Sequence, residues 1–79
     1  MTNLEKYNEV FCEVFGVSLE QLNSDFTNES IAEWDSIGHM NLISTIEETF
    51  DIMLDGEDIM QFQSYEQGKD ILKKYSIEV

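Results

Sequence analysis

The sequence has 79 residues, which by length is a single domain spanning residues 1–79, with a thin hydrophobic core. It carries 17 acidic residues against four lysines, for a formal net charge of −13. This balance disfavours nucleic-acid binding, which needs clustered Lys and Arg, and no apolar stretch is long enough for membrane insertion. We expect protein partners with basic docking patches, because opposite fields speed encounter. The alternative is that the charge only keeps the protein soluble.

The remaining compositional features favour a cytoplasmic monomer. Cys12 is the only cysteine, so no internal disulfide can form, and it has no nearby His or Cys partner for a metal or redox role. The N-terminal segment has neither a basic start nor an apolar run, so we expect no signal peptide.

The first predicted element is a helix over residues 3–15. Thr2 or Asn3 would cap its start, and Gly16 would end it in the left-handed conformation. Its apolar residues recur at spacings of three and four, which places them on one helical face: Leu4, Tyr7, Phe11, Val14 and Phe15.

A long loop is predicted over residues 16–35, where Ser, Asn, Asp and Thr favour turns and caps. Ser18 followed by Gln21 resembles a capping box, so we expect a single turn over residues 18–22. The apolar side chains expected to anchor the loop are Leu19, Leu22, Phe26, Ile31 and Trp34. A loop of this length in a compact domain is usually functional.

Two further main helices and one short helix are predicted in the rest of the chain. The second main helix begins at residue 35 or 36 and runs to about residue 50. Its core stripe consists of Leu42, Ile43, Ile46 and Phe50. A short helix over residues 57–61 follows an Asp-Gly turn. Ser64 with Gln67 predicts the start of the last helix, whose final turn holds Lys73 and Lys74. The expected fold is all-α: a small bundle of three main helices plus one short helix, with a long loop between helices one and two.

Ser36 is the first candidate for chemistry because it lies where the loop becomes a helix, directly after Asp35. A phosphate attached to its hydroxyl would lie at the positive end of the helix dipole, near free backbone N–H groups. Taken alone, however, this dipeptide is better interpreted as an ordinary N-cap serine.

The wider pattern resembles the acyl carrier protein family, including its peptidyl and D-alanyl carrier relatives. Its most specific parts are Asp35-Ser36-Ile37, which resembles the family's Asp-Ser-Leu attachment motif, and EETFDI over residues 47–52, which resembles the family's Glu-Glu-x-Phe-Asp-Ile. The resemblance covers nearly the whole chain.

The resemblance implies that Ser36 accepts 4′-phosphopantetheine from coenzyme A. A separate phosphopantetheinyl transferase, using Mg²⁺ and recognising the flanking Asp35, would attach it. The chain would not be an enzyme. It would carry acyl groups as thioesters for acyl-loading and acyl-transfer enzymes in fatty acid, polyketide or other specialised biosynthesis. A short acyl chain would be sheltered between the helices. Docking near helix two would involve Ile37, Met40, Glu47, Glu48, Asp51 and Asp55.

Three positions depart from the fatty acid carriers that the family includes. Gly38 and Asn41 stand where an acid is common, and Ser44 stands where an apolar residue is common. These departures indicate a carrier for a specialised pathway with its own enzymes. The alternatives are an unmodified acidic interaction module with a carrier-like fold, and a peptidyl or D-alanyl carrier.

Trp34 and His39 flank the motif. Burial as a loop anchor is the favoured interpretation of Trp34 over a role in shaping the approach to Ser36. His39 is expected to be an exposed helix residue near the phosphate. A Ser-His hydrolase is disfavoured, because nothing in the sequence supplies an oxyanion hole or substrate pocket.

The acidic turn after helix two does not fit a calcium loop. An EF-hand beginning at Asp51 would need ligands at positions three and twelve, which here are Met53 and Phe62. The acids that follow are expected to continue the docking surface or to be solvated: Asp55, Glu57 and Asp58.

Overall fold

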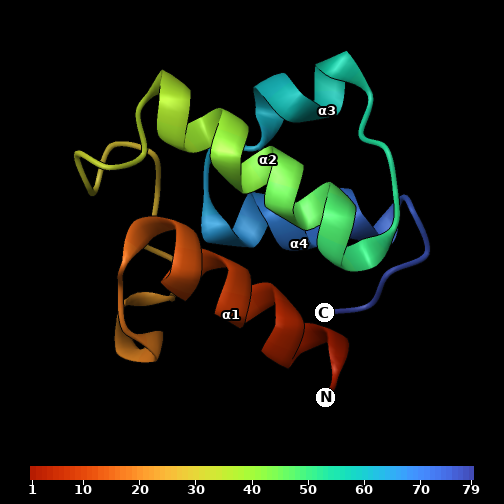
Figure 1. Cartoon of the computed structure of the whole chain (residues 1–79), viewed down its shortest axis with the longest axis horizontal. Coiled ribbons are helices and arrows are strands. Elements are labelled where there is room, and N and C mark those ends of the chain that lie inside the picture. Colours follow the sequence, from red (N-terminus) through yellow and green to blue (C-terminus); the bar gives the residue numbers. More distant parts are fainter.

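The computed structural model describes all 79 residues and confirms the all-α fold. Its helices are α1 (Asn3–Phe15), the 3₁₀ turn η1 (Leu19–Gln21), α2 (Ser36–Phe50), α3 (Gly56–Gln61) and α4 (Tyr65–Lys73). In Figure 1, α2 crosses the middle of the molecule with α4 behind it, α1 lies along one side and α3 along the other. None of the helices combines the length and the apolar character needed to cross a bilayer.

Local capping explains where the helices begin and end. Thr2 and Glu5 form the capping box of α1, in which each side chain accepts a hydrogen bond from the other residue's backbone N–H, both at 3.1 Å. Gly16 ends α1 with φ of 66°, a conformation that glycine adopts without steric cost. Ser64 caps α4 by accepting a hydrogen bond from the Gln67 N–H at 3.0 Å. These predicted caps are confirmed.

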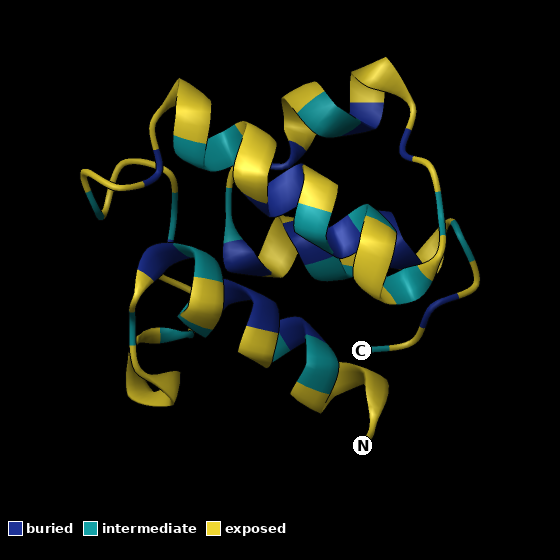
Figure 2. Cartoon of the chain, viewed as in Figure 1, coloured by how far each residue is buried: buried dark blue, intermediate teal, exposed yellow.

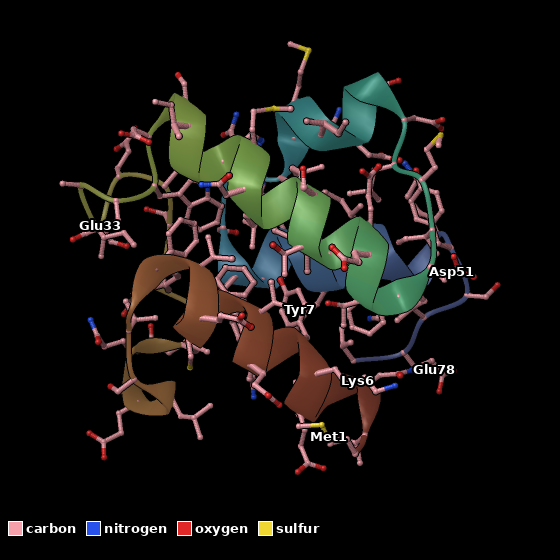
Figure 3. All side chains as sticks on the ribbon, in the orientation of Figure 1. Met1, Lys6, Tyr7, Glu33, Asp51 and Glu78 are labelled. Carbon is pink, nitrogen blue, oxygen red and sulfur yellow. The ribbon has the colours of Figure 1, made fainter.

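Aromatic side chains make up seven of the 15 buried hydrophobic residues of the core. Its fully buried members come from all the main helices and the junction before α4: Tyr7, Phe11, Phe62, Leu42, Ile43, Ile46 and Leu72. Tyr7 extends from α1 into the bundle, as Figure 3 shows, and its hydroxyl donates to the Tyr65 carbonyl at 2.6 Å. Gly68 lets α4 pack closely, because a Cβ there would overlap the side chains of Tyr7 and Phe62. Figure 2 shows this buried face where α1, α2 and α4 meet.

The long loop is bound to the rest of the fold at several points. Phe26 and Trp34 are buried in the core, as predicted. The Tyr65 N–H donates to the Phe26 carbonyl at 2.9 Å, and the Asn28 N–H donates to the Gln63 carbonyl at 2.8 Å. The predicted anchor Leu19 was wrong: it is 64% exposed because the single turn η1 buries none of its side chains.

Asp58 was also predicted wrongly, because its side chain is buried and not solvated. Its carboxylate accepts hydrogen bonds from Lys74 Nζ and the Tyr75 hydroxyl, each at 2.6 Å. The same Tyr75 hydroxyl accepts from the Asp55 N–H at 3.0 Å. We call Asp58, Lys74 and Tyr75 the α3–α4 latch, because they join the start of α3 to the end of α4. Lys74 therefore pairs with a carboxylate in addition to lying at the helix end.

Candidate functional site

Asp35 and Ser36 have different roles at the start of α2. Asp35 is the N-cap, and its Oδ1 accepts a hydrogen bond from the Gly38 N–H at 2.8 Å. Ser36 is the first helical residue and is exposed. The ordinary N-cap interpretation of Ser36 was therefore wrong, since its neighbour does the capping. The Ser36 hydroxyl itself makes no hydrogen bond within the protein.

Gly38 is required by the way the loop approaches α2. A Cβ at this position would lie well inside van der Waals contact of the Glu33 carbonyl oxygen. The absence of a side chain lets the loop backbone pass directly over the first turn of the helix. The glycine that departs from the acidic pattern of the fatty acid carriers therefore has a local steric explanation.

His39 is a bridge between three segments, which corrects its prediction as an exposed residue. Its Nδ1 accepts a hydrogen bond from Trp34 Nε1 at 3.0 Å. Because an indole nitrogen can only donate, the proton of the neutral imidazole is on Nε2, which donates to the Ile59 carbonyl at 2.8 Å. The loop, α2 and α3 are thus joined next to Ser36.

An open hollow of about 420 Å³ lies beside Ser36. Its lining comes from the loop, the first turn of α2, and α3 with the segment after it: Asn28, Trp34, Asp35, Ser36, His39, Met60 and Gln63. Sequence reasoning missed Asn28, Met60 and Gln63. They come together only through the loop's backbone bonds to the α3–α4 junction, and no local pattern marks them.

The predicted docking residues fall into two groups at opposite ends of α2. Ile37 and Met40 are 74% and 55% exposed and lie within the first turns, next to Ser36. The acidic residues Glu47, Glu48, Asp51 and Asp55 lie at or beyond the other end. A 15-residue helix is about 22 Å long, so the structure does not bring the two groups together.

Glu47 also has a structural contact. Its Oε2 accepts a hydrogen bond from the Leu54 N–H at 2.8 Å, which orders the segment between α2 and α3. The acidic charge closest to Ser36 in the chain comes instead from Glu33 and Asp35, which are exposed. Figure 3 shows Glu33 on the loop near the start of α2 and Asp51 at its far end.

The family model for the phosphopantetheine attachment site matches residues 8–67, about three quarters of the chain. The chain belongs to this family. Its members carry 4′-phosphopantetheine as a covalently attached cofactor, so this protein is a phosphopantetheine-carrying carrier protein. The hollow and the helix start described above lie within the matched region of this carrier. Searches of curated proteins and of solved structures found no match.

Proposed function

We propose that Ser36 bears the phosphopantetheine arm and that the chain is a non-catalytic carrier of acyl thioesters. The observation that carries this proposal is the exposed Ser36 hydroxyl at the first position of α2, with the capping task taken by Asp35. The 420 Å³ hollow beside Ser36 offers surface along which an attached arm can lie.

The start of α2 suits a phosphodiester. The backbone N–H groups of Ser36 and Ile37 have no protein acceptor, and they lie at the positive end of a 15-residue helix dipole. The Asp35 carboxylate accepts its hydrogen bond from the Gly38 N–H and so leaves the N–H groups of Ser36 and Ile37 free for another acceptor. These features favour an anion on the Ser36 oxygen.

In the modification step, the Ser36 Oγ forms a bond to phosphorus while the pyrophosphate P–O bond of coenzyme A breaks. The other product, 3′,5′-ADP, leaves, and the hydroxyl proton passes to a base of the transferase. The terminal thiol of the arm then supplies the thioester linkage. The role of this chain is to present the hydroxyl, because both ring nitrogens of His39 are already hydrogen-bonded and neither is available to activate Ser36.

Intact mass spectrometry tests the attachment site. The apo protein is incubated with coenzyme A, Mg²⁺ and a broad-specificity phosphopantetheinyl transferase. We expect a mass gain of one phosphopantetheine that is lost in Ser36→Ala and kept in Ser44→Ala, an exposed serine on the same helix. The absence of any gain would favour the alternative of an unmodified interaction module. A gain that persists in Ser36→Ala would overturn the assignment.

We further propose that partner enzymes contact Ile37 and Met40, the two exposed apolar side chains closest to Ser36 on α2. Met40→Ser should slow modification by the transferase severalfold without lowering the unfolding temperature, because the side chain is not part of the core. Met53→Ser is the matched control, since Met53 is 83% exposed but follows the other end of α2. Equal rates for the two variants would contradict this docking surface.

The most detailed part of the proposal concerns the pathway that the carrier serves. The residues at positions 38, 41 and 44 support a carrier with dedicated enzymes, because the front of α2 lacks the usual acids and apolar side chain. We therefore expect the modified protein to be a poor substrate for generic malonyl transfer and chain elongation. Efficient elongation by generic fatty acid enzymes would contradict a specialised pathway.

A further inference from the structure

Two aromatic side chains fill the space between the Ser36 hollow and the core. Trp34 and His39 both line the hollow, and their rings lie edge to edge, with centroids 6.3 Å apart and planes 18° apart. On its core side the Trp34 ring stacks on Phe15, with centroids 5.2 Å apart. Trp34 is only 4% exposed, so it separates the hollow from the interior.

Hydrogen bonds hold these two side chains in place. The Trp34 Nε1 donates to His39 Nδ1, and His39 Nε2 donates to the Ile59 carbonyl of α3. An acyl chain entering between α2 and α3 at this end would have to break the hydrogen bond between His39 and Ile59. That movement would break a part-buried hydrogen bond, which is unfavourable.

Behind this barrier the interior is already occupied. Phe11 and Phe62 are fully buried, and the Phe62 ring lies 6.4 Å from that of Trp34. Leu42 and Ile46 of α2 are also fully buried. Because protein interiors are close-packed, an alkyl chain could enter only by displacing several of these side chains.

The hollow is lined by more polar than hydrophobic residues, although apolar atoms make up the larger part of its surface. Only Trp34 and Met60 among its lining residues are hydrophobic. The side-chain amides of Asn28 and Gln63 can both donate and accept, which suits the two amide groups of a pantetheine arm.

From these contacts we infer that the Trp34–His39–Ile59 bridge closes the bundle beneath Ser36, so that the acyl cargo stays outside the core. This inference rests on the proposed attachment at Ser36. It contradicts the expectation from family resemblance that the helices shelter an acyl chain.

The test compares the protein loaded from acetyl-coenzyme A with the protein loaded from decanoyl-coenzyme A. Mass spectrometry first establishes that each form carries its acyl arm. A failure to load would contradict the proposed attachment at Ser36, but it would not test whether the acyl chain is excluded from the core. We expect the two forms to unfold at the same temperature. The emission maximum of Trp34, the only tryptophan, should also be the same in both. A decanoyl form that melts several degrees higher, with altered Trp34 emission, would overturn the inference.

Variants at His39 test the bridge. His39→Gln keeps one acceptor and one donor and should behave like the native chain. His39→Ala removes the bridge, so its decanoyl form should melt higher than its acetyl form. Equal melting temperatures for the two forms of His39→Ala would overturn the role given to His39. If His39→Ala fails to fold, the comparison of the two native loaded forms still decides the inference.

Discussion

Single side chains at the start of α2 decide what Ser36 can do. Asp35 caps the helix by accepting a hydrogen bond from the Gly38 N–H, which leaves the serine hydroxyl exposed and unbonded. Gly38 lets the Glu33 carbonyl approach, and this contact places the loop over the helix start. The geometry around Ser36 therefore depends on one carboxylate and one missing side chain.

Gly38→Ala should destabilise the protein by about 1–3 kcal/mol, because the new methyl group would overlap the Glu33 carbonyl oxygen and force the backbone to shift. Urea denaturation measures this change. Gly56→Ala is the matched control: nothing lies within 4 Å of a Cβ there, and Ala favours the helix, so its stability should stay the same or rise. Equal effects of both substitutions would show that the close approach is unimportant.

At the scale of elements, the α3–α4 latch fixes a helix too short to be stable alone. α3 has six residues, and an isolated helix of that length is marginal in water. Asp58 joins it to Lys74 and Tyr75, whose hydrogen bonds lower the pKa of the Asp58 carboxyl below its usual value. The same contacts raise the pKa of Lys74 and of Tyr75. Since Ile59 of α3 accepts the His39 hydrogen bond, the latch also supports the site.

The latch predicts a pH-dependent contribution to stability. Because the folded pKa of Asp58 is lowered from 3.8, its contribution is complete well above pH 4 and is lost as the pH falls through the folded pKa. Asp58→Asn should therefore melt below the native protein at pH 7, with the difference shrinking towards pH 2–3.

Comparing native and variant proteins at each pH removes the general effect of titrating the other acids. Asp70→Asn, at an exposed carboxylate 3.8 Å from Lys73, is the control and should change the melting temperature little at any pH. A melting difference for Asp58→Asn that does not vary with pH would contradict the latch.

The elements that the sequence predicts well are those that local signals determine. Apolar spacing and the caps at Thr2, Gly16 and Ser64 place the helices, because these interactions span only a few residues. The burial of Asp58 and the bridge at His39 could not be predicted, because each depends on a partner 16 to 20 residues away. The hollow likewise depends on Asn28 meeting Gln63. Ser36 itself stood out only through a family resemblance.

At the scale of the whole molecule, the negative charge is poorly compensated. A net charge of −13 is carried by a bundle of 29 × 27 × 20 Å. Three of the four lysines are paired with acids of α3 or α4: Lys69 with Glu66, Lys73 with Asp70, and Lys74 with Asp58. The loop and α2 therefore present an excess of acid to any partner, and the folded chain repels itself.

Salt should stabilise the protein. Raising NaCl from 10 mM to 300 mM shortens the screening length from about 30 Å to under 10 Å, so self-repulsion falls and the melting temperature should rise. The triple variant Asp25→Asn, Glu29→Gln, Glu33→Gln removes three loop charges whose carboxylates make no ion pair, and its salt dependence should be weaker. A melting temperature that falls with salt would mean that the lysine ion pairs outweigh the repulsion.

The backbone hydrogen bonds between the loop and the α3–α4 junction determine which loop residues can vary in sequence without disturbing the fold. They hold the loop at Phe26 and Asn28, and the buried Trp34 holds it again before Ser36. Between these two anchors, Glu29, Ala32 and Glu33 are exposed, whereas the Ser30 hydroxyl bonds to the backbone of Thr27. Substitutions in this short arc can alter the surface that a partner meets beside Ser36 while the folding of the bundle is left almost untouched. This part of the surface beside Ser36 can therefore change in sequence with little effect on stability.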